Sequence, residues 1–167
     1  MDIFGVCLEF VEKKFNGNAG FVYNRNENVM NASGRGFKTM HKNTILIIED
    51  EPLLAELLAA LAERQGLVPY LAPDGVEGLA TAKTIAPDVI LCDISMPGVD
   101  GFAVLRALRN HPRTQHTPVI MMTAYSEEYC AQDAARRGAD AFLVKPFMMN
   151  QLGETIAEVL ARYRRAV

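Results

Sequence analysis

The feature that most constrains the fold is a regular alternation, from residue 44 onward, of short apolar runs with segments of helical periodicity. The first run, Thr44–Ile48, is rich in isoleucine, which is typical of a strand that is buried on both faces. Strands are expected over 44–48, 67–72, 88–92, 118–122 and 141–144. Helices are expected over about 52–65, 75–85, 101–110, 127–137 and 150–163. This alternation predicts an α/β fold in which a parallel sheet carries helices on both faces.

Local signals mark where these helices begin and end. Pro52 suits the first position of a helix, because the N–H that proline lacks is not needed there. Gly66 suits the C-terminal end of the same helix. Asp74 can cap the next helix, although Gly75 and Gly78 make that segment a poor helix former.

Length and charge exclude several classes of protein. The 167 residues suffice for one ordinary domain with a short extra segment. The 17 basic and 20 acidic residues give a net charge of -3, which argues against a protein that binds nucleic acid or an anionic membrane. No apolar run is long enough for a transmembrane helix. The three cysteines lack metal-binding spacing, so we expect no zinc site and a location in the reducing cytoplasm.

Composition changes near residue 42, and we divide the chain there into an N-terminal extension, 1–42, and a domain, 43–167. The extension has no sustained helical or strand period, apart from a possible short helix over Phe4–Phe15. We expect it to be disordered, or residues 1–39 to be an upstream translation ahead of a natural initiator at Met40. Mass spectrometry of the N-terminus of the natural protein would distinguish the two hypotheses.

Polar side chains end or follow four of the expected strands. Glu49 and Asp50 follow the first expected strand, Asp93 comes directly after the third, Thr123 directly after the fourth and Lys145 directly after the fifth. In a doubly wound sheet of order 2-1-3-4-5, ligands bind beyond these carboxyl ends. Clustered carboxylates repel each other, and Mg²⁺ relieves that repulsion while leaving positions open for phosphate oxygens. An aspartate in such a cluster can act as a nucleophile on phosphorus and form an aspartyl phosphate.

Four motifs at these strand ends resemble the receiver domain of two-component response regulators. They are ILIIEDEP at 45–52, LCDISMPGVDG at 91–101, VIMMTA at 119–124 and FLVKPF at 142–147. The resemblance covers residues 44 to about 163 and implies a flavodoxin-like, doubly wound (βα)5 sheet of order 2-1-3-4-5. It also implies a phosphoacceptor signalling module that is not an enzyme, beyond self-catalysed phosphotransfer and autodephosphorylation.

The resemblance implies a role for each residue at the sheet edge. Asp93 is expected to accept a phosphoryl group from a histidine kinase or a histidine phosphotransfer protein. The expected cofactor is Mg²⁺, bound directly by Asp50, through a water by Glu49, and by the backbone carbonyl of Ser95. Thr123 is expected to act as a switch hydroxyl.

Two further residues match the family's switch. Lys145 matches the lysine that pairs with the phosphoryl group, and Lys145–Pro146 matches a cis peptide bond. Phe142 matches the aromatic side chain whose inward or outward rotamer reports phosphorylation. A buried aromatic with no switching role remains the alternative for Phe142.

Other polar and sulfur-containing residues have a structural interpretation. Asp100 is interpreted as a helix cap and not as a metal ligand. Cys92 neighbours Asp93 but faces the opposite side of the strand, so we expect a core thiol. The histidines are expected in loops and not as phosphodonors or ligands: His41, His111 and His116.

Three functions compete at this stage. The leading hypothesis is a stand-alone receiver, monomeric or dimeric on phosphorylation, that binds a partner protein through the face of segments 127–137, 141–144 and 150–163. The second is a Mg²⁺-dependent phosphohydrolase that uses an aspartyl phosphate. Such an enzyme needs an acid two residues after the nucleophile, where this chain has Ser95. The third is a receiver fragment of a larger hybrid kinase or regulator.

Overall fold

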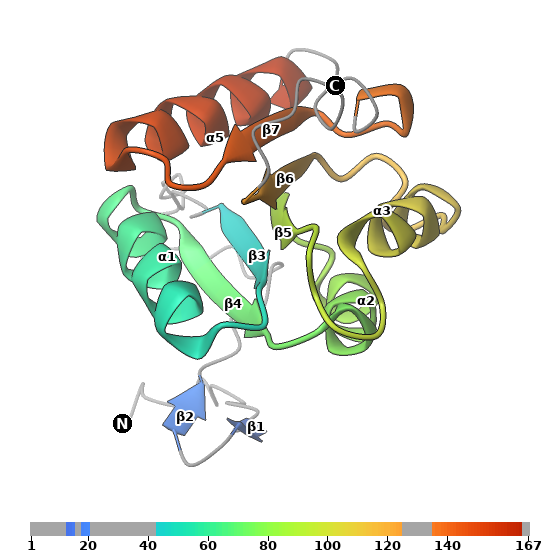
Figure 1. The fold of residues 1–167 in the computed structure, drawn as a ribbon, viewed down its shortest axis with the longest axis horizontal. Coiled ribbons are helices and arrows are strands. Elements are labelled where there is room, and N and C mark those ends of the chain that lie inside the picture. Colours follow the sequence, from blue (N-terminus) through green and yellow to red (C-terminus); the bar gives the residue numbers. More distant parts are fainter. Residues whose placement is uncertain (1–12, 16–17, 21–42, 125–134, 165–167) are drawn as a thin grey trace, which may run out of the picture. The chain divides into compact units, whose positions relative to one another are not determined.

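The computed structural model describes residues 13–15, 18–20, 43–124 and 135–164 (Figure 1). The chain divides into two compact units, Met1–His41 and Lys42–Val167. In the first unit, β1 (Lys13–Phe15) pairs with β2 (Asn18–Gly20) in an antiparallel hairpin. The short helix expected up to Phe15 is therefore wrong for its last three residues, and the rest of it lies outside the described residues. Asn-Gly, the dipeptide between the strands, favours hairpin turns over helix continuation.

The second unit contains the expected alternation of strands and helices. The strands are β3 (Thr44–Ile48), β4 (Val68–Ala72), β5 (Val89–Asp93), β6 (Val119–Thr123) and β7 (Ala141–Val144). The helices are α1 (Pro52–Arg64), α2 (Gly75–Ile85), α3 (Gly101–Arg109) and α5 (Met149–Arg164). The strands form one parallel sheet in the order β4-β3-β5-β6-β7, which confirms the predicted order 2-1-3-4-5.

The helix expected over 127–137 falls largely on residues 125–134, which lie outside the described residues. Residues 135–136 are helical, and Gly138 has a φ of 92°, as expected where a helix ends at a glycine. None of the described helices is both long enough and apolar enough to cross a membrane.

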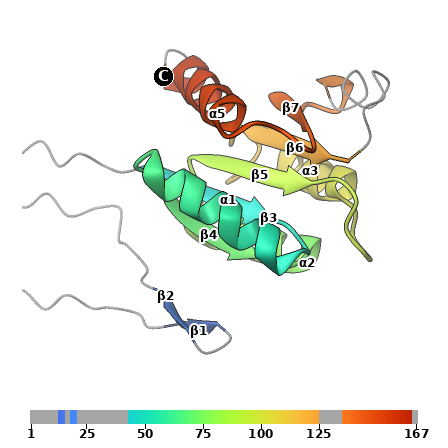
Figure 2. The same ribbon diagram turned by 60° about the vertical axis from the view of Figure 1, so that its left-hand side comes forward.

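Helices cover both faces of the sheet (Figure 2). Alternate strand residues such as Ile45 and Ile47 pack with α1 and α5 in one core cluster. Their neighbours Leu46 and Ile48 pack with α2 and α3 in a second cluster on the opposite face. All four side chains are fully buried, because strand side chains alternate between faces and both faces are covered. The sheet is thus a rigid platform whose carboxyl ends position the polar residues.

The two glycines that weaken α2 allow it to pack closely. Asp74 caps the helix, because its side chain accepts a hydrogen bond from the Glu77 amide at 2.8 Å. A Cβ atom at Gly78 would lie 2.6 Å from the side chain of Ile48, and one at Gly75 would collide with α3. The helix therefore gives up intrinsic propensity in exchange for close contact with the sheet.

Helix α1 begins at Pro52, as expected, and ends shortly before Gly66, which has a φ of 80°. Its leucines repeat at helical spacing, but they do not all face the core. Leu58 is buried, whereas Leu53 and Leu57 are 76% and 54% exposed. The leucine pattern alone therefore overstates how much of α1 is covered by the sheet.

Candidate functional site

The carboxyl ends of neighbouring strands bring the predicted polar residues to one edge of the sheet. Glu49 directly follows β3, and Asp93 is the last residue of the adjacent β5. Thr123 is the last residue of β6, and Lys145 directly follows β7. Because the strand order is β3-β5-β6-β7, the four residues follow one another along that edge.

Lys145 joins two carboxylates from different strands. Its Nζ lies 2.7 Å from Glu49 Oε2 and 2.8 Å from Asp93 Oδ1. The second oxygen of Asp93 accepts a hydrogen bond from the Ser95 amide at 2.8 Å. The second oxygen of Glu49 faces the Glu51 amide at 3.4 Å. Every carboxylate oxygen of this pair therefore has a donor.

The carboxylates of the site differ sharply in burial. Glu49 is 3% exposed and Asp93 is 4% exposed, whereas Asp50 is an exposed residue. One oxygen from each of the three lies within 4.8 Å of the others, which is close enough to hold a metal ion together. Hard carboxylate oxygens are the donors that Mg²⁺ prefers, so the donor set fits the predicted cofactor.

The electrostatics of the site are set by burial and by Lys145. Burial raises the pKa of Glu49 above its usual value, and the Asp93 charge adds to this, while the hydrogen bond and charge of Lys145 oppose it. Burial alone would lower the pKa of Lys145, but its hydrogen bonds to Asp93 and Glu49 outweigh burial and raise that pKa. Lys145 is therefore held as a cation between the two acids.

The predicted switch residues occupy the next two strands. Thr123 is 1% exposed, and its backbone carbonyl accepts a hydrogen bond from the Lys145 amide at 2.6 Å. Phe142 is half-buried and packs against the core cluster on the α2 and α3 face. The Lys145–Pro146 peptide bond is cis, which confirms that expectation.

The helix-cap interpretation of Asp100 and the core position expected for Cys92 are confirmed. Asp100 caps α3, because its side chain accepts a hydrogen bond from the Ala103 amide at 2.7 Å. Cys92 is fully buried, and this burial raises the pKa of its thiol. Among the histidines, His111 and His116 lie in the turn region after α3, and His41 lies outside the described residues.

Gly101 is a site residue whose role the sequence did not reveal. A Cβ atom at this position would collide with the backbone carbonyl of Asp93. The amide of Gly101 donates a hydrogen bond to the Ile94 carbonyl at 3.0 Å. Glycine here lets the loop from β5 to α3 close tightly on Asp93. The Asp-Gly pair signals a turn, but only the fold shows which backbone atom the glycine approaches.

Comparison with known proteins agrees with this geometry. A profile described as the response regulator receiver domain matches residues 45–157. The regulator RpaA of Synechocystis sp. is 39% identical over 121 residues, which cover 72% of this chain and 49% of RpaA. Protein PilH of Pseudomonas aeruginosa is 38% identical over 117 residues, which cover 70% of this chain and 97% of PilH. The chain thus spans about half the length of RpaA and nearly all of PilH.

Solved structures share the fold. The receiver domain of the sensor histidine kinase PA1611 from Pseudomonas aeruginosa, which holds a magnesium ion in its active-site cleft, superimposes with a TM-score of 0.67 and 25% identity. The match covers 72% of this chain and 98% of that domain. The profile match, the strand order and the relatives agree, and the chain belongs to the response regulator receiver domain family of two-component signalling systems.

Proposed function

We propose that residues 43–167 form a receiver that takes a phosphoryl group onto Asp93 and thereby switches the binding of a partner protein. The observation that carries this proposal is the setting of the Asp93 carboxylate. It is 4% exposed, and its two oxygens are held by the Lys145 ammonium and the Ser95 amide at 2.8 Å each. A buried carboxylate that is oriented by a cation at a sheet edge is suited to act as a nucleophile.

The acidic cluster supports Mg²⁺ as the cofactor. Asp50, Asp93 and the backbone carbonyl of Ser95 would hold the ion, and Glu49 lies within the same cluster. When bound, the ion supplies positive charge that offsets the carboxylates and the phosphoryl oxygens.

The chain's own residues then direct the transfer. An oxygen of Asp93 forms a bond to phosphorus, while the bond from phosphorus to the donor's imidazole nitrogen breaks and its electron pair leaves with the imidazole. Lys145 lies 2.8 Å from Asp93, so its ammonium is placed to pair with an incoming phosphoryl oxygen. The donor is a histidine kinase or a histidine phosphotransfer protein.

The switch follows from contacts that form after transfer. Thr123 ends the strand beside Asp93, so its hydroxyl is placed to donate to a phosphoryl oxygen. Movement of Thr123 then leaves room for Phe142 to turn inward from the neighbouring strand. Such contacts bias an existing two-state equilibrium. We place the downstream protein on the face that includes β7, α5 and residues 127–137, with phosphorylation-dependent dimerisation as the alternative outcome.

Other functions are less well supported. A phosphohydrolase would use an acid at position 95, where the chain has an exposed serine. The net charge of -3 disfavours nucleic acid and anionic membranes as partners, and the cysteine content suits a reducing compartment such as the cytoplasm. The match covers about half of RpaA. The proposed receiver mechanism would be the same if this domain were part of a longer regulator.

The central test is Asp93→Asn, which keeps the side chain's shape but removes the anionic nucleophile. Wild type incubated with acetyl phosphate and Mg²⁺ should gain one acid-labile phosphoryl group by intact mass, and the variant should gain none. Asp100→Asn is the matched control and should be phosphorylated like wild type. Phosphorylation of the Asp93→Asn chain at the wild-type rate would exclude Asp93 as the acceptor, leaving Asp50 and Glu49 as the next candidates.

The coupling between phosphorylation of Asp93 and the switch at Thr123 and Phe142 is tested separately with Lys145→Ala. This variant keeps the nucleophile, so it should still be phosphorylated, although more slowly. Beryllofluoride should shift the NMR signals of β6 and β7 in wild type and leave them unmoved in the variant. Shifts confined to the loop after Asp93 in wild type would mean that the domain stores a phosphoryl group without switching.

A further inference from the structure

Strand β4 is an outer strand of the parallel sheet, because β3 is its only neighbour among the described strands. The backbone bonds to β3 show which residues of β4 face that neighbour. The Val68 amide donates to the residue just before β3 at 2.9 Å, and the Ala72 carbonyl accepts from the residue just after β3 at 3.1 Å. Backbone groups alternate in direction along a strand, so Pro69 and Leu71 point theirs to the open side of β4.

Prolines remove most of the hydrogen-bond donors from this open side. Pro73 is the first residue after the strand and continues the alternation, and neither it nor Pro69 has an N–H. Leu71 lies between the two prolines, carries the remaining outward N–H and is 40% exposed. No described residue bonds to the outward backbone groups of Pro69 or Leu71. The open side of β4 therefore offers several acceptors but one donor.

An uncovered outer strand is a template for pairing with another chain, and two copies of β4 would meet across a twofold axis. If the axis passes through Tyr70, position 69 of each copy faces position 71 of the other, and each such pair has room for two backbone hydrogen bonds. Pro69 lacks one of the two donors, so half of these bonds are lost. If the axis passes through Leu71, the two Leu71 residues bond to each other, but Pro69 faces Pro73 and neither donates. Both arrangements thus keep half of the bonds of a regular antiparallel pair.

We propose that the open side of β4 is an interface for a second copy of this chain, and that Pro69 and Pro73 keep this interface closed. A short strand with half of its bonds cannot offset the freedom that two molecules lose on association. A single donor restored at position 69 completes the pairing in both arrangements. This inference is independent of the proposed function, because it uses no residue of the acidic cluster.

The test is Pro69→Val, which returns an N–H to the open side and introduces a residue that favours strands. The full-length variant should self-associate at least about tenfold more tightly than wild type, because the number of intermolecular backbone bonds doubles. Sedimentation velocity in the absence of Mg²⁺ and of a phosphoryl donor measures both proteins, so phosphorylation cannot contribute. A Pro69→Val chain that is as monomeric as wild type would overturn the proposal.

Two variants control for the loss of a proline as such. Pro112→Val changes an exposed proline in the turn region after α3 and should sediment like wild type. Pro69→Val/Leu71→Pro moves the missing donor by two residues along the same side, so it should also sediment like wild type. If this double variant associates as tightly as Pro69→Val, the contact does not run through the open side of β4 and the proposal is wrong. Circular dichroism establishes that each variant is folded.

Hydrogen–deuterium exchange gives a readout that the wild type itself supplies. The Leu71 amide should exchange rapidly, whereas the Tyr70 amide, which faces β3, should be protected. In Pro69→Val the protection of the Leu71 amide should rise with protein concentration. A Leu71 amide that is protected in monomeric wild type would show that another part of the chain covers the open side, and the prolines would then not be what keeps it closed.

Discussion

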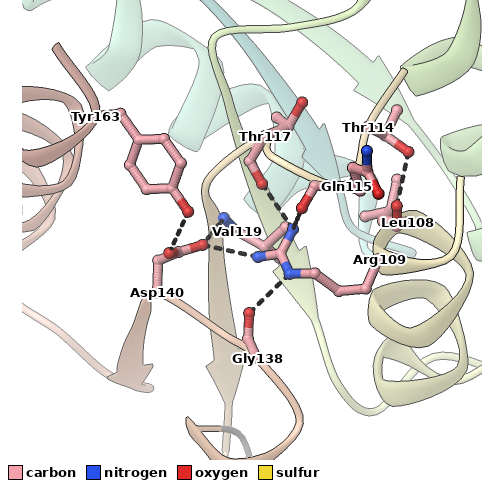
Figure 3. A network of polar contacts seen from close by, with 9 residues as sticks. All are labelled: Leu108, Arg109, Thr114, Gln115, Thr117, Val119, Gly138, Asp140 and Tyr163. Atoms are coloured by element: carbon pink, nitrogen blue, oxygen red, sulfur yellow. Dashed lines mark hydrogen bonds and ion pairs between the residues drawn. The ribbon is translucent and has the colours of Figure 1, made fainter. Parts of the chain in front are cut away.

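The two edges of the sheet each carry an ion pair, and the two pairs are built for different purposes. At the carboxyl edge, Lys145 is shared between Glu49 and Asp93. At the amino edge, Arg109 pairs with Asp140 at 2.8 Å, just before β7 begins (Figure 3). Both pairs are largely buried, but the first is one ammonium with two competing acids, whereas the second is part of a closed network.

Arg109 uses its guanidinium as a fixed fork. Besides Asp140, it donates to the backbone carbonyls of Gly138 at 2.9 Å, Thr117 at 2.8 Å and Gln115 at 3.4 Å. These acceptors lie on the loops that enter β6 and β7. The contacts hold the end of α3 against both loops.

Asp140 is equally occupied. One of its oxygens accepts from Arg109 and from the Val119 amide at 2.8 Å, and the other accepts from the Tyr163 hydroxyl at 2.6 Å. A planar guanidinium with fixed donors suits a permanent joint, whereas a flexible ammonium can exchange partners. We infer that the amino edge is a static anchor and the carboxyl edge is the part that rearranges.

The largest expected effect comes from Asp140→Ala. The change leaves the Arg109 guanidinium without its acid and leaves the Val119 amide and Tyr163 hydroxyl without an acceptor. The free energy of unfolding should fall by about 3 kcal/mol in urea titrations. Asp50→Ala at the other edge is the comparison, and in Mg²⁺-free buffer it should be neutral or slightly stabilising because it relieves repulsion. Equal losses from the two variants would contradict the distinction between the edges.

Exchanging the two kinds of cation should have unequal consequences. Arg109→Lys replaces a fork with a point charge that cannot reach all the acceptors, and it should cost about 2 kcal/mol of unfolding free energy. Lys145→Arg should change the free energy of unfolding by less than about 1 kcal/mol, because the new guanidinium can still pair with Glu49 and Asp93. Thermal unfolding of both variants measures the difference. A larger loss for Lys145→Arg would mean that the carboxyl edge is the more rigid one.

Mg²⁺ should stabilise only through the carboxyl edge. At a Mg²⁺ concentration several times the dissociation constant, binding to the folded state adds about 1 kcal/mol to the free energy of unfolding. This should raise the melting temperature by a few degrees. Arg109→Lys should keep this increment, and Asp50→Asn should lose it. A wild-type melting temperature that does not respond to millimolar Mg²⁺ would count against the site.

The smallest expected effect is a pH dependence at the amino edge. Burial, and then the hydrogen bond and charge of Asp140, raise the pKa of Tyr163 to about 12. Because the pKa of Tyr163 is raised on folding, its hydroxyl makes its full contribution to the free energy of unfolding below the unfolded pKa of about 10. That contribution is lost as the pH rises through the folded pKa of about 12. Since the side chain is partly exposed, the loss should be below about 1 kcal/mol.

Urea titrations at several alkaline pH values would measure this loss. Tyr163→Phe lacks the titrating group, so the difference in stability between wild type and this variant should shrink over the same interval. A difference that stays constant with pH would show that the hydroxyl contributes nothing through its bond to Asp140.

The sequence by itself determined the elements and the place of the site. Buried parallel strands require near-continuous apolar runs, and those runs were visible in the chain from Thr44 onward. Since the carboxyl ends of parallel strands meet at one edge, the residues after each run had to approach one another. That is why Asp93, Glu49 and Lys145 could be placed together from sequence.

Only the tertiary structure decided which of these groups pair. The Arg109 and Asp140 contact joins residues 31 positions apart through two loops, and no local pattern announces it. The exposure of Leu53 and Leu57 likewise depends on how α1 lies on the sheet. Strand and helix patterns follow from short-range geometry and side-chain polarity, whereas the choice of Glu49 as a partner for Lys145 depends on ångström-scale distances that exist only after the sheet has formed.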